Sequence, residues 1–277
     1  MRATLLDRVH FTVTDLYRRM DFALSCAFHH GTAMIRAHIN SSSDLNVTEM
    51  AWKVFNDMKV KWHDKIFLQG VIFILPSFEF GTTGKAEEIA AVGIKYGGSI
   101  LGASFSTPTS EFSSDSEKDG TYTTAQFTDE LSGLFALAKK FELYIDVHVD
   151  EHADGKSENL LMLARETIAQ NYQGKVTASH CCSLSLASPE LLQSTIQSIL
   201  EAGIAVVSLP TCNLYLQVVF YSIIYSDLRK LSRTARPQRR LVGEDALLCK
   251  SCGRRVFQFR LLPITSEMLS SLTAIWI

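Results

Sequence analysis

The feature that most constrains the fold of this chain is a repeat of apolar, strand-like runs separated by helical patterns. Six runs begin near residues 34, 66, 99, 144, 175 and 204, so the intervals between them are 32, 33, 45, 31 and 29 residues. One strand and one helix in about 30 residues is the unit of a doubly wound sheet or a (β/α)8 barrel. The repeat therefore predicts a parallel α/β fold with about six βα units.

The elements of this repeat can be bounded from the sequence. Apolar spacing predicts helices over 14–30, 44–62, 85–96 and 124–140, and apolar runs predict strands over 32–40, 66–75 and 99–105. For the first helix, Thr14 or Asp15 is the expected cap and Gly31 the expected end. No G-x-G-x-x-G motif follows the first strand, which disfavours a dinucleotide-binding sheet. This weakens the doubly wound alternative without excluding it, and a TIM-type (β/α)8 barrel would be incomplete here, because a closed one has eight strands.

Two segments depart from the repeat. Residues 106–123 are rich in Ser and Thr and lengthen one interval; following a strand, they form either a lid over the catalytic face or an inert solvated insertion. Residues 218–277 hold ten Lys and Arg against four Asp and Glu, whereas residues 1–217 carry a net charge of −8. We expect two regions, a barrel over 1–217 that lacks its first strand and an atypical basic tail over 218–277.

Composition excludes several classes of function. No basic face is interleaved with aromatic residues, so nucleic acid is not an expected partner. No run approaches about 18 consecutive apolar residues, which argues against a membrane span. The start of the chain carries charges where a secretory signal has its apolar core, and the six cysteines are then expected to be free thiols in the cytoplasm.

Ionisable side chains gather at the ends of two successive strands. In YIDVHVDE (144–151), alternation places His148 and Asp150 on one side of the strand, with Glu151 just past its end, and His180 closes the next strand. The carboxyl ends of barrel strands carry the catalytic residues, so we expect these side chains to share a site. Neutral imidazoles suit Zn²⁺ or Fe²⁺, and a nearby carboxylate can carry protons. A single histidine at a strand end is more often structural, but two on successive strands with a glutamate in step are as compatible with a metal-assisted hydrolase as with a structural role.

The segments IDVHVDE, VTASHC and CNLYLQ, with HHGTAMIRAHIN and IFLQGVIF, resemble the cytosine deaminase branch of the amidohydrolase superfamily over about residues 12–217. This resemblance implies a metal-dependent barrel hydrolase that acts on a C–N bond and deaminates a nucleobase-like or cyclic amidine substrate. It implies that His148 is a metal ligand, that Glu151 shuttles protons and that His180 lies beside the nucleophile. Gln69 falls near the substrate region of that family.

Two further residues are expected near the site. His38 ends a strand, and the resemblance implies that a His in this strand lies near the site without being a metal ligand; Asn213 closes the last strand of the repeat. Asn213 either shapes the substrate pocket or satisfies backbone groups of a loop. With Gln69, these residues form the expected substrate-binding set.

The sequence also departs from the family. Members carry an H-x-H pair on the first strand and an Asp on the eighth as metal ligands, but no H-x-H occurs here and the segment after Gln217 resembles no member. One interpretation is a truncated or mis-spliced product of a deaminase gene. The other is a catalytically inactive barrel relative that acts as an interaction or regulatory protein. Such a relative would pair with another copy or a paralogue through unclosed sheet edges.

Overall fold

The computed structural model describes residues 11–42, 44–74, 84–105, 124–152, 154–209 and 213, and the backbone of two short strands further along the chain. The Ser- and Thr-rich insertion at 106–123 and most of the basic tail lie outside the described residues. Within them, six parallel strands form one sheet in the order β1-β2-β3-β4-β5-β6. The six parallel strands expected from the repeat are therefore confirmed.

Strands and helices alternate along the chain. The strands are β1 (Met34–Asn40), β2 (Phe67–Ile74), β3 (Ile100–Ser104), β4 (Tyr144–Val149), β5 (Val176–His180) and β6 (Ala205–Val207). The helices are α2 (Val13–His29), α3 (Leu45–Trp62), α4 (Lys85–Lys95), α5 (Thr124–Lys140), α6 (Asn159–Ala169) and α7 (Pro189–Ala202), with a 3₁₀ turn η3 (Cys182–Leu186). Farther on, β7 (Leu247–Cys249) and β8 (Arg254–Val256) form an antiparallel pair.

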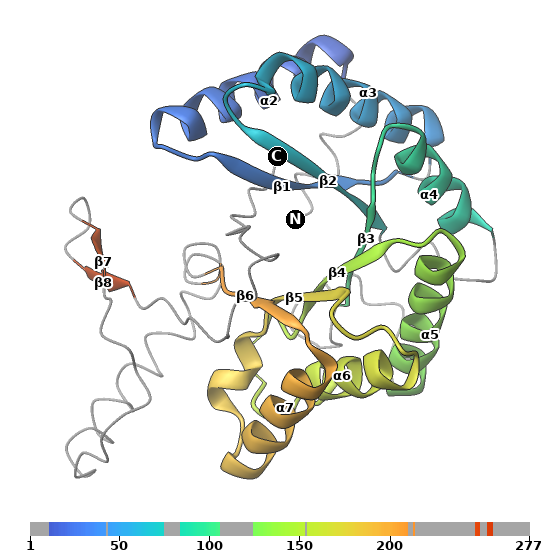
Figure 1. Ribbon diagram of the computed structural model, residues 1–277, viewed down its shortest axis with the longest axis vertical. Coiled ribbons are helices and arrows are strands. Elements are labelled where there is room, and N and C mark those ends of the chain that lie inside the picture. Colours follow the sequence, from blue (N-terminus) through green and yellow to red (C-terminus); the bar gives the residue numbers. More distant parts are fainter. Residues whose placement is uncertain are drawn as a thin grey trace, which may run out of the picture.

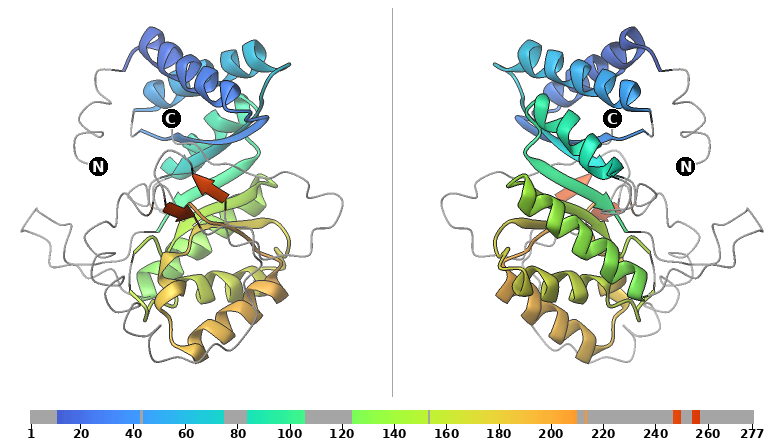
Figure 2. Two further views of the ribbon diagram at one scale, coloured as in Figure 1. Left: turned by 90° about the vertical axis from the view of Figure 1, so that its left-hand side faces the viewer. Right: turned by 90° about the vertical axis from the view of Figure 1, so that its right-hand side faces the viewer.

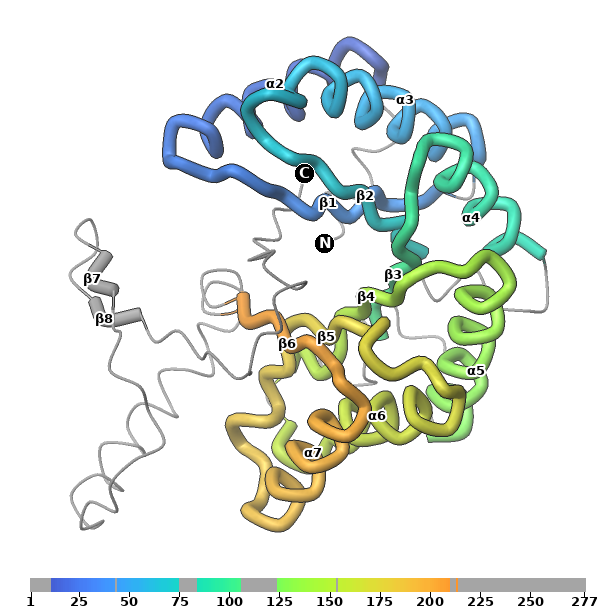
Figure 3. Tube along the Cα trace, in the orientation of Figure 1, coloured from blue at the N-terminus to red at the C-terminus, as the bar shows by residue number. Residues whose placement is uncertain are grey.

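The sheet curls into part of a barrel with the helices on its outer side. In Figure 1 the strands follow an arc from β1 to β6, and α2 to α7 lie outside that arc. The side views place α2 and α3 at one end of the arc and α6 and α7 at the other (Figure 2), and the Cα trace follows the same path (Figure 3). The fold is a curled half-barrel, as expected for an incomplete (β/α)8 barrel.

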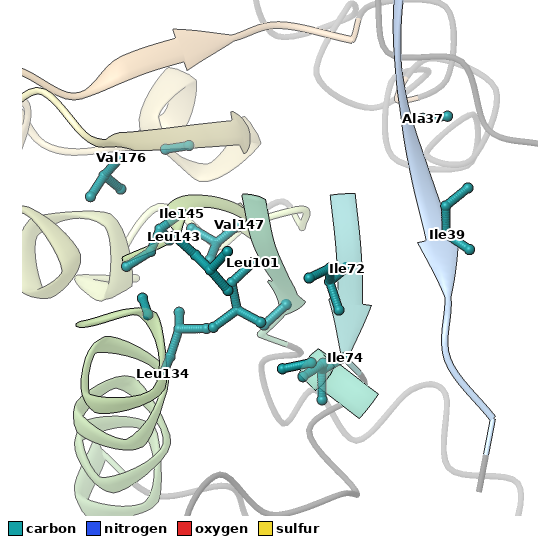
Figure 4. Close-up of a cluster of buried hydrophobic side chains, with 14 of the residues drawn as sticks. Ala37, Ile39, Ile72, Ile74, Leu101, Leu134, Leu143, Ile145, Val147 and Val176 are labelled. Atoms are coloured by element: carbon teal, nitrogen blue, oxygen red, sulfur yellow. The ribbon is translucent and has the colours of Figure 1, made fainter. Parts of the chain in front are cut away.

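The outer face of the sheet forms the hydrophobic core with the helices. Leu101 of β3 and Val147 of β4 are fully buried, and Figure 4 shows them near Leu134 of α5. Each fully buried aliphatic side chain of this size contributes roughly 1.5–3 kcal/mol. Because alternate residues point to opposite faces of a strand, packing these positions outward turns the intervening ones toward the barrel interior.

Glycine at position 70 lets α3 approach β2. A Cβ atom there would lie 2.7 Å from Phe55 and 2.8 Å from Trp52, both buried on α3. These distances are too short for real carbon contacts, so the rings fill the space that a side chain would need. The close packing of α3 on β2 therefore depends on this glycine.

The helix bounds follow the sequence signals closely. Asp44 caps α3, as its side chain accepts a hydrogen bond from the Asn46 amide at 2.9 Å. The prediction that Thr14 or Asp15 caps α2 was wrong. Thr12 caps that helix, because its side chain accepts a hydrogen bond from the Asp15 amide at 3.2 Å. α2 ends at His29, just before Gly31, whose φ is +81°. None of the described helices has the length and apolar character needed to cross a membrane.

Candidate metal centre

The barrel interior brings His148, Glu151 and His180 together where β4 and β5 end, and these three side chains are called the ligand group below. Each offers one ligand atom, and these atoms lie within 4.8 Å of one another. The His148 and His180 side chains are buried and their ring centroids are 4.6 Å apart, while Glu151 is partly exposed. Parallel pairing of β4 with β5 places their carboxyl ends at the same edge of the sheet. Two nitrogen ligands and one oxygen ligand can therefore face one point.

Left-handed backbone at both strand ends gives this group its geometry. His180 pairs in register with Val149, a residue of the hydrophobic core, so regular alternation would turn it outward. Instead φ is +75° at His180 and +50° at Cys181, and the His180 ring contacts the inward His148. The prediction that Asp150 shares the side of His148 was wrong, since φ is +55° at Asp150 and its carboxylate binds the start of α6.

Hydrogen bonding fixes the orientation of the His180 ring. Its Nδ1 lies 2.9 Å from the Asn213 amide nitrogen and 3.2 Å from Oε1 of Glu151. Its Nε2 is buried and has no hydrogen-bond partner among the described residues. A buried polar nitrogen without a partner is costly, so a ligand at this position would satisfy it. Nε2 is thus the nitrogen that His180 presents to a bound group.

Burial sets the charge of the group. It lowers the pKa of His148 to about 2, assisted by the nearby His38 and His180. It also lowers the pKa of His180 to about 4, against the opposing hydrogen bond from Asn213. Burial raises the pKa of Glu151 to about 7. Both imidazoles are therefore neutral at pH 7, the form in which histidine binds a metal.

A buried carboxylate supports the group from within the barrel. Asp146 accepts a hydrogen bond from Arg36 Nη1 at 2.6 Å and from Ser179 Oγ at 3.4 Å, and its Oδ1 lies 3.4 Å from His38 Nε2. Burial alone would raise the pKa of Asp146, but the hydrogen bond and charge of His38, together with Arg36, hold it below its ordinary value. The His38 ring is 4.8 Å from that of His148. Asp146 therefore holds His38 against His148.

The expected substrate-binding residues are placed differently from one another. His38 contacts His148, and Asn213 contacts His180, so both border the candidate metal centre. Gln69 lies near the start of β2, where its Oε1 accepts a hydrogen bond from Arg36 Nε at 2.8 Å. Sequence reasoning assigned no role to Arg36 or Asp146. The sequence did contain a signal for them: Arg36 lies two residues before His38, and Asp146 two residues before His148, so each shares a strand face with its histidine.

The donor set fits a divalent metal ion. Neutral imidazoles suit both zinc and iron, and a carboxylate beside them can either complete the coordination or carry protons. His148, Glu151 and His180 provide two nitrogens and an oxygen, with the buried Nε2 of His180 lacking another described partner. The site can therefore hold such an ion with residues of β4, β5 and the loop after β4.

Known proteins are similar to this chain in sequence and in fold. A pterin deaminase from Rhizobium rhizogenes is 31% identical over 208 residues, which is 75% of this chain and 43% of the relative. Structures of 5-methylcytosine deaminase from Klebsiella pneumoniae with phosphonocytosine and with 5-fluorocytosine give TM-scores of 0.58 and 0.59 at 23% and 22% identity. Both alignments cover 74% of this chain and 45% of the other.

A third structure, N-isopropylammelide isopropylaminohydrolase from Burkholderia multivorans, has a TM-score of 0.52 at 22% identity over 67% of this chain and 43% of the other. No family model matches the sequence. The chain spans less than half the length of the pterin deaminase it matches. Over about 75% of its own length, the chain is similar in sequence to a pterin deaminase, and its half-barrel has the fold of the 5-methylcytosine deaminase structures.

Proposed function

We propose that this site supports metal-assisted hydrolysis of a C–N bond, the deamination of a nucleobase-like or cyclic amidine ring. The observation that carries the proposal is the convergence of His148, Glu151 and His180 within 4.8 Å at the carboxyl ends of two barrel strands. The names of the relatives support the substrate class, since they act on pterin, 5-methylcytosine and an ammelide.

Each residue has a role that follows from its position. His148 and His180 would hold zinc or iron through their neutral imidazoles. When bound, such an ion supplies the Lewis acidity that activates water at neutral pH. Glu151 takes a proton from the attacking water and delivers it to the leaving nitrogen, a role its place beside His180 allows. Asn213 keeps the His180 ring in one orientation.

His38 and Asn213 border the metal centre and would contact the substrate ring. We assign Gln69 a different role, because its amide oxygen is engaged by Arg36, which in turn holds Asp146. Gln69 would thus support the charged network under the site. Cys26, Cys181 and Cys182 are free thiols, and this supports the cytoplasmic setting proposed for the chain.

Ammonia release tests the proposal. The chain, loaded with zinc or iron, is assayed with pterin, cytosine and 5-methylcytosine. Glu151→Gln removes the proton carrier and should lower kcat/KM by about 100-fold or more. The matched control is Glu158→Gln, an exposed residue in the same loop, which should retain the activity.

A substrate turned over equally well by wild type and Glu151→Gln would contradict the role given to Glu151. If the folded, metal-loaded chain releases no ammonia from any of these rings, the alternative gains support: a non-catalytic interaction or regulatory protein. Sedimentation of the chain, alone and with a paralogue, would then identify pairing with itself or with that partner.

A further inference from the structure

Two neighbouring strand ends leave the extended conformation at the same level of the barrel. Five non-glycine residues among those described have a positive φ, and three of them are Asp150, His180 and Cys181. A left-handed conformation costs a residue with a side chain about 1 kcal/mol or more. Such a concentration next to the ligand group indicates that the surrounding structure maintains this backbone for the site.

The backbone of Asp150 ties the two strand ends together. Its carbonyl oxygen accepts hydrogen bonds from the amides of Cys182 at 2.8 Å and Ser183 at 3.3 Å, and one residue earlier the Val149 carbonyl accepts from Cys181 at 3.0 Å. The turn that follows His180 is therefore fastened to the end of β4. Movement of residue 150 would be transmitted to His180.

The side chain of Asp150 points away from the ligand group. It is buried, and its Oδ1 accepts a hydrogen bond from Ser157 Oγ at 2.6 Å while Oδ2 accepts from the Leu160 amide at 3.1 Å. Glu158, the residue at the N-cap position of α6, makes no side-chain capping bond. The Asp150 carboxylate thus caps α6 from a distance and anchors the loop between β4 and α6 at both ends.

We propose that Asp150 is a positioning residue that turns Glu151 toward His180 and so completes the ligand group. In an extended continuation of β4, residue 151 would share the outward side of Val147 and Val149. The left-handed residue before it redirects the chain, and Glu151 Oε1 then lies 3.2 Å from His180 Nδ1. The metal-binding part of this inference rests on the proposed function; the geometry of the Glu151–His180 contact does not.

Three substitutions distinguish the effect of the Asp150 carboxylate from the effect of the left-handed backbone at residue 150. Asp150→Asn can still accept from the Leu160 amide and donate to Ser157 Oγ, and asparagine tolerates left-handed backbone. Asp150→Ala removes both side-chain hydrogen bonds and disfavours that backbone. Asp150→Gly removes the bonds but favours it. The control is Asp154→Ala, an exposed residue of the same loop.

The first measurement needs no metal. The ring ¹⁵N resonances of His180, assigned by comparison with His180→Gln, are recorded for each metal-free variant, and circular dichroism confirms folding. We expect these resonances to shift in Asp150→Ala and Asp150→Gly, and to stay in place in Asp150→Asn and Asp154→Ala. If Asp150→Ala and Asp150→Gly do not fold, Ser157→Ala removes one of the two anchoring bonds and is expected to shift the same resonances.

The second measurement is a titration with Co²⁺ followed by its visible absorption. Loss of the supporting carboxylate in Asp150→Ala and Asp150→Gly should weaken Co²⁺ binding by about 10- to 100-fold, whereas Asp150→Asn should restore it to within a few-fold of wild type. Wild-type protein that binds no Co²⁺ would contradict the proposed function alone. Unchanged His180 resonances in folded Asp150→Ala and Asp150→Gly, or in Ser157→Ala if neither folds, would overturn the positioning role.

Discussion

At the scale of single residues, the buried charge of Asp146 is balanced by partners far away in the sequence. Arg36 precedes it by 110 residues and His38 by 108, yet both lie within 3.4 Å of its carboxylate. Breaking a buried ion pair by removing one partner leaves the other charge without compensation, which costs far more than replacing both. The pair therefore affects stability most when only one member is changed.

This asymmetry gives a stability prediction. Asp146→Leu should lower the free energy of unfolding by about 3–5 kcal/mol, because Arg36 stays largely buried without its carboxylate. The double variant Arg36→Met/Asp146→Leu should lose clearly less. Urea denaturation measures both. A single variant within about 1 kcal/mol of wild type, or a double variant at least as unstable as the single one, would contradict this account of the network.

The residues of the candidate site show how much of a site the sequence can reveal. His148, Glu151 and His180 were recognisable because each lies at or just beyond the end of an apolar run. The orientation of Asp150 was not recognisable, because alternation assumes an extended backbone. Glycine would have suggested a positive φ, but aspartate gives no such signal for its φ of +55°. The Arg36–Asp146 pair was missed because its members come together only when the sheet curls.

At the scale of elements, periodicity predicted most bounds well. The helix expected at 124–140 is α5 with the same ends, and the strand expected at 99–105 is β3 over Ile100–Ser104. Apolar spacing reports which face is buried, so it locates an element firmly. It is silent on capping when several residues qualify, and the cap of α2 was therefore placed too far along the chain.

The contact of β2 with α3 supplies the second prediction. Gly70→Ala introduces a methyl group where Phe55 and Trp52 already pack, so it should destabilise the fold by about 1–3 kcal/mol. Adding Phe55→Leu should recover part of that loss by making room, although Phe55→Leu alone is destabilising. Thermal and urea unfolding of the three variants measure these changes. If the losses of unfolding free energy in the two single variants simply add in the double variant, the methyl group does not contact the Phe55 ring.

A third prediction concerns the pH dependence of the contact between α2 and α3. Asp21 lies 2.8 Å from Lys61 Nζ and accepts from Trp62 Nε1 at 2.9 Å. The hydrogen bond with Lys61 lowers the pKa of Asp21, against the opposing effect of burial. A lowered folded pKa means that the contribution is present above the unfolded value of about 3.9 and disappears as pH falls through the folded value.

Asp21→Asn should therefore reduce stability at neutral pH by less than about 1 kcal/mol, since the pair is partly exposed. The difference from wild type should vanish between about pH 5 and pH 2. Urea unfolding across that range measures it, with Asp57→Asn, exposed on α3, as the control. A penalty that is the same at every pH would show that the charge of Asp21 is not what stabilises this contact.

At the scale of the whole molecule, the described part of the chain is a half-barrel that contains a ligand group of its own. The spacing of the apolar runs was enough to predict six strands in one parallel sheet. It could not predict which rings the site accepts, because substrate choice depends on a few contacts around the centre and not on the repeat. The names of the relatives contain candidate substrate rings, but this chain spans only 43% of the pterin deaminase, so its own substrate stays a proposal.

The metal content of the purified, tag-free chain, measured by elemental analysis, tests whether His148, Glu151 and His180 form a metal site. Wild type should carry about one zinc or iron per chain, and His148→Ala should carry none, because it removes a buried ligand. His63→Ala, which changes an exposed histidine at the end of α3, should retain the metal. A folded wild-type chain without metal, or equal metal in wild type and His148→Ala, would contradict the assignment of this site.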